Sequence, residues 1–159
     1  MALSMGIERE SIREVIEITD LGGPPTINFI RRARKGIETE NRKLGVFPSS
    51  FNPLTEAHVE IIEEAKKYDP SEILLVLDKE NIDKGIFGAS LEDRLLVLLL
   101  FFDSDDEISI ALSSHGLFLD KARALENEYP PATKIVFLVG YDTIVRILDK
   151  NIIRIGKPV

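Results

Sequence analysis

A chain of 159 residues that is 44% apolar and 30% charged is long enough to fold as one domain with a substantial hydrophobic core. The lack of cysteine excludes disulfides, thiolate catalysis and cysteine metal sites, and two histidines, His58 and His115, are too few for a multi-histidine metal centre. The net charge of −7 argues against general nucleic-acid binding, which needs a basic surface.

The sequence shows no segment suited to a membrane. Its longest apolar run, residues 95–102, is too short to cross a bilayer. The N-terminus carries Glu8, Glu10 and Glu14 and lacks the continuous apolar stretch of a signal peptide. We therefore expect a cytoplasmic protein with no membrane partner.

The first 43 residues differ in charge from the rest of the chain. They hold eight basic and seven acidic side chains, whereas residues 44–159 hold twelve and twenty. Apolar spacing predicts an amphipathic helix over residues 8–19, and a Gly-Gly-Pro-Pro break follows. A second helix is predicted over residues 26–36. We interpret residues 1–43 as an N-terminal helical extension.

The predicted second helix carries a basic run: Arg31, Arg32, Arg34 and Lys35. This run fits a solvated helix face. It also fits a contact with an acidic partner or a neighbouring subunit, so a homo-oligomer is one possible assembly.

From residue 44 onward, strand-like and helix-like segments alternate. Strands are predicted over 44–48, 72–77, 108–112 and 135–139, and helices over 55–68, 90–102, 117–128 and 143–149. Continuous apolar runs such as Ile73–Leu77 are typical of parallel strands buried on both faces. The pattern predicts a doubly wound α/β sheet over residues 44–159, with ligands beyond the carboxyl ends of its strands.

The first predicted strand leads through a polar turn into a helix that begins near Thr55. Thr55 and His58 lie three residues apart and project from one face of its first turn. The start of such a helix favours anions, because unpaired backbone N–H groups and the positive dipole end point the same way. We interpret this segment as a phosphoryl-transfer site, although Thr55 also fits a simple helix cap.

Three ordered motifs in residues 44–150 resemble the nucleotidyltransferase superfamily, and most closely its nicotinamide and nicotinate mononucleotide adenylyltransferases. They are Ser-Phe-Asn-Pro-x-Thr-x-x-His at 50–58, Lys84 with the Ser-x-x-x-Arg motif at 90–94, and Gly-x-Asp at 140–142. The resemblance implies a Rossmann-like fold. It also implies transfer of an adenylyl or cytidylyl group from ATP or CTP to a phosphate-bearing acceptor, with release of pyrophosphate.

The same resemblance implies roles for individual residues and for a metal ion. The catalytic residues would be His58 and Thr55; the nucleotide-binding residues Ser49, Ser50, Phe51, Asn52, Lys84 and Arg94; and the acceptor-binding residues His115, Gly140 and Asp142. Mg²⁺ is implied by the triphosphate chemistry, and no residue identifies itself as a ligand of that metal. Arg94 fits a local ion pair equally well, His115 a helix start, and Asp142 a helix cap.

The sequence departs from the family pattern in three places. Ser49 and Ala57 stand where glycines are usual, and a side chain there crowds a nucleotide that approaches the backbone. No late Ser/Thr-Ser/Thr-x-x-Arg segment occurs before Val159, so we expect either a short protein or one truncated at its C-terminus. The alternative functions are a nucleotide-binding module that has lost turnover, and a structural subunit.

Overall fold

The computed structural model describes residues 2–79 and 88–148 of the chain. In chain order its elements are α1 (Ala2–Ile18), β1 (Ile27–Arg31), β2 (Lys43–Pro48), α2 (Glu56–Lys66), β3 (Glu72–Asp78), α3 (Leu91–Phe101), β4 (Ile108–Ser113), α4 (Phe118–Glu126), β5 (Lys134–Phe137) and α5 (Tyr141–Leu148). The strands and helices predicted from residue 44 onward are confirmed, with ends that differ by one or two residues. Helix α1 begins six residues earlier than expected.

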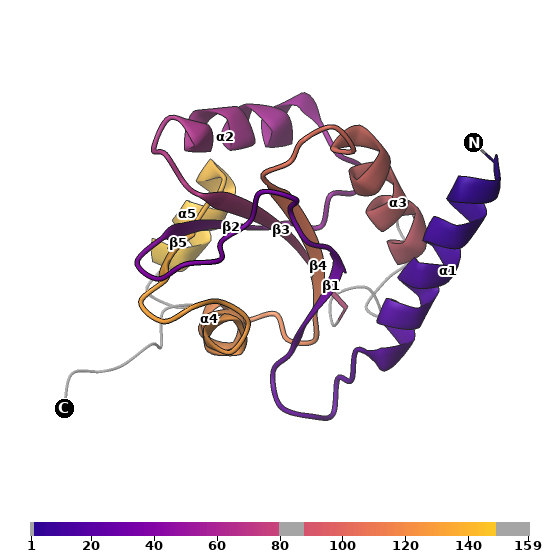
Figure 1. Cartoon of the computed structure of the whole chain (residues 1–159), viewed down its shortest axis with the longest axis horizontal. Coiled ribbons are helices and arrows are strands. Elements are labelled where there is room, and N and C mark those ends of the chain that lie inside the picture. Colours follow the sequence, from indigo (N-terminus) through magenta and orange to yellow (C-terminus); the bar gives the residue numbers. More distant parts are fainter. Residues whose placement is uncertain (1, 80–87, 149–159) are drawn as a thin grey trace.

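The five strands form one sheet in the order β1-β4-β3-β2-β5, shown near the centre of Figure 1. Strands β2 to β5 run parallel, and β1 pairs antiparallel with β4 at one edge. The predicted parallel α/β sheet is therefore confirmed. The order reverses between β2 and β5, because the chain first adds β3 and β4 on one side of β2 and then returns to its other side.

Helices cover both faces of the sheet, which explains the continuous apolar runs in the strands. Alternate residues of β3 point to opposite faces. Ile73 and Leu75 pack with Ile62 of α2 in a core beneath α1, α2 and α3, whereas Leu74 packs with Leu125 of α4 in a second core. Among the described residues, no helix combines the length and apolar character that crossing a bilayer requires.

The helix predicted over residues 26–36 is wrong, because the segment contains β1. Residues 27–31 form this strand, and Ile27 pairs with Ser113 of β4. The run Thr-Ile-Asn-Phe-Ile contains β-branched and aromatic residues that favour a strand, and the exposed edge of β4 supplies the hydrogen-bonding partners. The division of the chain at residue 43 stays a prediction, but the segment before it is not wholly helical.

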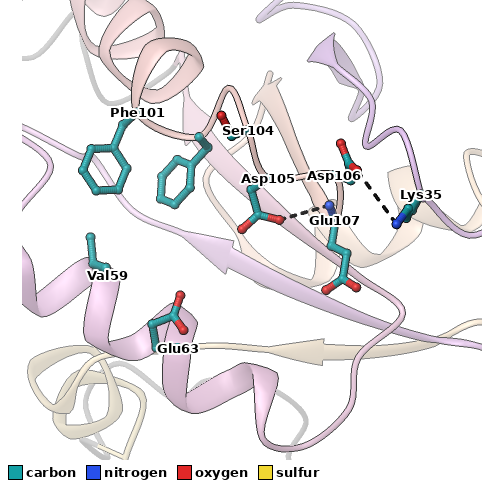
Figure 2. Close-up of a pocket in the computed structure, with 9 residues that line it drawn as sticks. Lys35, Val59, Glu63, Phe101, Ser104, Asp105, Asp106 and Glu107 are labelled. Atoms are coloured by element: carbon teal, nitrogen blue, oxygen red, sulfur yellow. Dashed lines mark hydrogen bonds and ion pairs between the residues drawn. The ribbon is translucent and has the colours of Figure 1, made fainter.

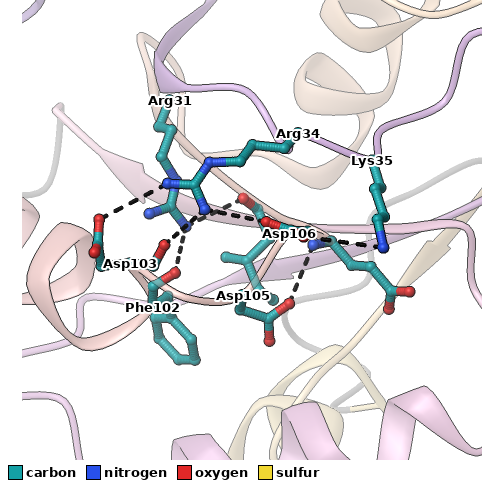
Figure 3. A network of polar contacts seen from close by, with 9 residues as sticks. Arg31, Arg34, Lys35, Phe102, Asp103, Asp105 and Asp106 are labelled. Atoms are coloured by element: carbon teal, nitrogen blue, oxygen red, sulfur yellow. Dashed lines mark hydrogen bonds and ion pairs between the residues drawn. The ribbon is translucent and has the colours of Figure 1, made fainter.

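Most of the basic run, which begins with Arg31 at the end of β1, binds a loop of the same chain, as Figure 3 shows. Arg31 donates a hydrogen bond to the carbonyl oxygen of Phe102 at 2.8 Å. Arg34 donates to the carbonyl oxygen of Asp103 at 2.9 Å and to the carboxylate of Asp106 at 3.0 Å. Arg31 and Arg34 therefore fix the connection between α3 and β4, whereas Arg32 pairs with Glu128 at 2.6 Å. The run does not form the predicted face of a helix.

Candidate functional site

The candidate site lies where the order of the parallel strands reverses. The carboxyl ends of β2 and β5 are neighbours there, since Val46 of β2 pairs with Phe137 of β5. In doubly wound sheets, this reversal opens a crevice between the strand ends that binds ligands. The turn after β2 and the turn after β5 form its two sides.

A cavity of about 690 Å³ occupies this position. Its walls come from the turn after β2, the start of α2, the end of β3, the start of α4 and the start of α5. The lining residues are Phe47, Pro48, Ser49, Ser50, Thr55, Ala57, His58, Ile61, Asp78, Gly116, Phe118, Lys121, Gly140, Tyr141, Asp142 and Thr143. The cavity thus brings together His58, Thr55, Ser49, Ser50, Gly140 and Asp142 from the predicted site.

The imidazole of His58 is held at both of its nitrogens. The backbone N–H of Thr55 donates to Nδ1 at 3.0 Å. Because a backbone N–H can only donate, Nδ1 carries a lone pair, and the proton of the neutral ring is on Nε2. The hydroxyl of Thr55, 2.8 Å from Nδ1, must then donate to this nitrogen as well. Nε2 lies 3.1 Å from Oγ of Ser49, and this oxygen accepts a hydrogen bond from Nε2–H.

This arrangement leaves the hydroxyl hydrogen of Ser49 available to a ligand. Its oxygen accepts from Nε2–H of His58 and lies 3.4 Å from the backbone nitrogen of Phe51. The O–H bond is therefore directed away from both donors, and Ser49 lines the cavity. In this arrangement the hydroxyl of Ser49 is the donor directed toward a ligand, and the imidazole N–H beside it is donated to the serine oxygen.

The surroundings of His58 keep its ring neutral. Burial lowers the pKa of His58 below its usual range. The ring packs 4.9 Å from the ring of Phe51 and 5.9 Å from the ring of Phe47, measured between centroids. The N–H of Thr55 acts in the same direction, because it binds the lone pair of the neutral ring. At neutral pH the residue is an uncharged hydrogen-bond donor.

Two of the predicted nucleotide-binding residues hold the segment before α3. Oδ1 of Asn52 accepts the backbone N–H of Ala89 at 3.0 Å, and a side chain at Gly88 would collide with Asn52. Nε of Arg94, which is buried, donates to the carbonyl oxygen of Ala89 at 2.8 Å. Neither residue lines the cavity, so their contact with a nucleotide stays a prediction.

The other predicted residues differ in position. Phe51 is buried under the imidazole of His58 and does not line the cavity. Nδ1 of His115 lies 2.7 Å from Oγ of Ser114, and His115 stands beside the cavity wall at Gly116. Lys84 lies outside the described residues.

An ion pair in the cavity wall was missed from the sequence. Lys121 of α4 is 1% exposed, and its Nζ lies 2.7 Å from the carboxylate of Asp78 at the end of β3. Nζ also donates to the carbonyl oxygens of Gly116 at 2.8 Å and His115 at 3.2 Å. Lys121 lies three residues before buried Ala124, on the apolar side of α4. This position on the helix was the one feature of the sequence that could have indicated its burial.

The carboxylates in the cavity wall are few, so they suit a metal ion that takes most of its ligands from the phosphates of a bound molecule. No group of three or more histidine, aspartate or glutamate side chains in the described part of the chain could hold a cation alone. Asp78 and Asp142 provide carboxylates in the cavity wall, and Asp78 is paired with Lys121. Mg²⁺ usually needs only one or two protein carboxylates when phosphates supply other ligands.

Comparison with known proteins identifies the family of this chain. Residues 46–157 match the family model described as cytidylyltransferase-like. The match spans more than half of the chain and includes every cavity residue, so the protein belongs to the cytidylyltransferase-like family. The superfamily assignment made from the motifs is confirmed.

Several curated proteins are similar to this chain. A Schizosaccharomyces pombe protein with the name "Putative nicotinamide mononucleotide adenylyltransferase" is 36% identical over 115 residues, which is 71% of this chain and 45% of that protein. A phosphopantetheine adenylyltransferase of Clostridium novyi is 33% identical over 78 residues, 49% of this chain and 46% of its own length. The chain spans about half the length of the curated relatives it matches.

Proposed function

We propose that this protein transfers a nucleotidyl group, with ATP as the first choice of donor, to the phosphate of a small acceptor and releases pyrophosphate. The observation that carries the proposal is the neutral imidazole of His58, which presents Nε2–H beside the hydroxyl of Ser49 at the start of α2. Hydrogen-bond donors at a helix N-terminus in a sheet crevice suit a phosphate that gains charge during reaction.

In the proposed reaction, an oxygen of the acceptor phosphate attacks the α-phosphorus of the nucleoside triphosphate. The bond from that phosphorus to the oxygen bridging to the β-phosphate breaks, and pyrophosphate leaves with the electron pair. The protein supplies no covalent group, so catalysis depends on positioning and on charge stabilisation. Nε2–H of His58 would turn from Ser49 to an α-phosphate oxygen, and the backbone N–H groups at the start of α2 would add their dipoles.

Neutralising the negative charge of the triphosphate requires more positive charge than the described cavity wall offers. Lys121 is the one basic residue among the described lining residues, and it is paired with Asp78. Mg²⁺ would neutralise phosphate charge when bound, and Asp142 is a suitable carboxylate ligand on the wall. Lys84 and Arg94 are the further cations proposed for the nucleotide.

The proposed acceptor is a mononucleotide such as nicotinamide or nicotinate mononucleotide. Nicotinamide mononucleotide appears in the name of the S. pombe relative, and phosphopantetheine adenylyltransferases match a shorter stretch. The cavity is also lined by two aromatic residues, Phe118 of α4 and Tyr141, which stands between Gly140 and Asp142 in the chain. This combination suits a flat heterocycle with a hydroxyl-bearing sugar.

One observation supports a second candidate, a nucleotide-binding module without turnover. The methyl group of Ala57 lines the cavity where the family motif has glycine, and it narrows the approach of a nucleotide to the backbone. The structural-subunit alternative was based on a basic helix at residues 31–35. That segment begins at the end of strand β1, and Arg31 and Arg34 bind the 102–106 loop of the same chain, so the observation behind this alternative is absent.

Pyrophosphate release separates these candidates. The protein is incubated with Mg²⁺, ATP or CTP, and a panel of mononucleotides and phosphopantetheine, and ligand binding is followed in parallel by thermal stabilisation. We expect release with ATP and one class of acceptor, and loss of release in His58→Gln. Binding without release supports the module. Absence of both binding and release refutes the proposed function.

A further inference from the structure

Helix α3 carries a stripe of apolar side chains that no other described element covers. Its inner side chains Leu95 and Leu98 are fully buried. On its outer side Val97, Leu100 and Phe101 are 45%, 49% and 58% exposed. Their spacing of three and four residues places them on one face. A helix that is apolar on all sides is typical of one that is covered on all sides.

The stripe forms one wall of a groove between α2 and α3. The first part of this groove, about 580 Å³, lies between Leu54 and Val59 on one side and Val97 and Phe101 on the other. Val59 and Phe101 also line a second part of about 420 Å³, which extends to the loop at 104–107. Figure 2 shows Val59 and Phe101 on either side of this second part. The α3 wall of the groove is thus apolar, and Leu54 and Val59 add apolar side chains on the α2 side.

The rim of the groove is acidic. The acidic residues that line its two parts are Glu56, Glu60, Glu63, Asp105, Asp106 and Glu107. Lys35 is the one basic residue among the described lining residues, and its Nζ lies 4.0 Å from Asp106. Glu56 and Glu60 are exposed and form no ion pair within residues 2–79 and 88–148. Glu63 and Asp105 pair with Lys66 at 3.3 and 2.9 Å, and Asp106 pairs with Arg34 at 3.0 Å. Within the described residues, the negative charge that borders the groove without an ion pair therefore lies mainly on α2, at Glu56 and Glu60.

We propose that the groove between α2 and α3 binds a basic amphipathic helix of a partner protein. Apolar side chains spaced three and four residues apart would pack between Val59 and Phe101, as helices do in apolar grooves. Lysine or arginine residues on the flanks of that helix would face Glu56 and Glu60. The stretch from Glu56 to Glu63 rises about 10 Å, so a partner helix of two to three turns covers it.

Charge makes a second copy of this chain a poor occupant of the groove. A twofold contact through the α3 stripe would bring two identical surfaces together. Each copy would bring its Glu56 and Glu60 to the contact, and the chain already carries a net charge of −7. Like charges at an interface are unfavourable. The proposal does not depend on the nucleotidyltransferase activity.

A synthetic helical peptide provides the test. The probe is an 18-residue Leu/Lys peptide with leucines at helical spacing; its controls are a peptide of the same composition without that spacing and a Leu/Glu peptide with it. Affinity is measured by calorimetry, and contacts are mapped by backbone amide NMR of the protein. We expect the probe to bind at least tenfold more tightly than either control and to shift residues 56–63 and 97–107.

Two pairs of variants separate the apolar and charged contributions. Val97→Ser/Phe101→Ser should lower the affinity for the probe peptide at least tenfold. Glu56→Gln/Glu60→Gln should lower this affinity at least threefold and reduce its dependence on salt concentration. All four side chains are exposed or border solvent, and thermal unfolding checks that each variant is folded. If the serine pair does not fold, the glutamine pair and the NMR map decide.

Matched controls lie on other helices. Leu117→Ser/Leu119→Ser changes two exposed leucines at α4, and Glu14→Gln/Glu17→Gln changes two exposed glutamates of α1; both pairs should leave affinity unchanged. Probe binding that persists in the groove variants, or that maps away from α2 and α3, overturns the proposal. Self-association that the serine pair abolishes also overturns it, since the occupant is then a second copy.

Discussion

Substitution of His58 separates a structural role from a catalytic one. Nδ1 accepts the N–H of Thr55 and so caps the start of α2, while the ring packs on Phe51 and Phe47. His58→Ala removes both. Loss of the cap costs about 1 kcal/mol, and loss of the ring contacts costs about 1 kcal/mol more. The expected decrease in the free energy of unfolding is about 2 kcal/mol, a fall in Tm of roughly 4–8 °C.

His58→Gln is the matched variant. Glutamine is favoured at this third helical position, because its side-chain oxygen reaches back to the N–H of the capping residue. The cap should survive, so Tm should fall by only about 2–4 °C, from the lost ring contacts. Pyrophosphate release should be lost in both variants.

Thermal unfolding and the pyrophosphate assay are run on both proteins. Equal destabilisation of the two variants would refute the capping argument. Wild-type activity in His58→Gln would show that the imidazole takes no part in the chemistry.

Three further predictions concern titration and the buried ion pair. The pKa of His58 is lowered in the folded protein, so the unfolded chain takes up the proton first as pH decreases. The free energy of unfolding should therefore fall as pH decreases from about 6.5 toward the folded pKa. Urea titrations of His58→Gln should show a weaker fall. Burial raises the pKa of Glu72, so wild type should lose stability relative to Glu72→Gln as pH rises from about 4.5 toward the folded pKa. Parallel pH curves would contradict this. Lys121→Met removes the ammonium group 2.7 Å from the carboxylate of Asp78 and should cost about 3–5 kcal/mol in urea unfolding. Addition of Asp78→Asn should recover part of this loss, and an unchanged double mutant would refute the pairing argument.

The sequence predicted most of the fold because its strands are buried on both faces. Runs such as Ile73–Leu77 allow few other structures, and helical spacing marked the segments between them. β1 was the exception. Its residues favour a strand only moderately, and the basic run beside it suggested a helix. The free edge of β4, which is absent from any local pattern, decided the conformation of residues 27–31.

The site was predicted in part. The strand-turn-helix pattern around His58 located the anion-binding end of α2, and Gly140 and Asp142 were expected at the same edge of the sheet. Lys121 was not expected, because lysine on a helix is usually solvated. Its burial follows from the carboxylate of Asp78, which lies 43 positions earlier in the chain and on a different element.

The sequence by itself determined the alternation of buried strands with helices and the position of the polar turns, because both depend on local spacing and burial. The tertiary structure decided the neighbours: β5 beside β2, which opens the cavity; the hydrogen bonds that fix the proton of His58 on Nε2; and the acidic groove between α2 and α3. These features join residues far apart in the chain, and their energies exist only once the sheet has formed.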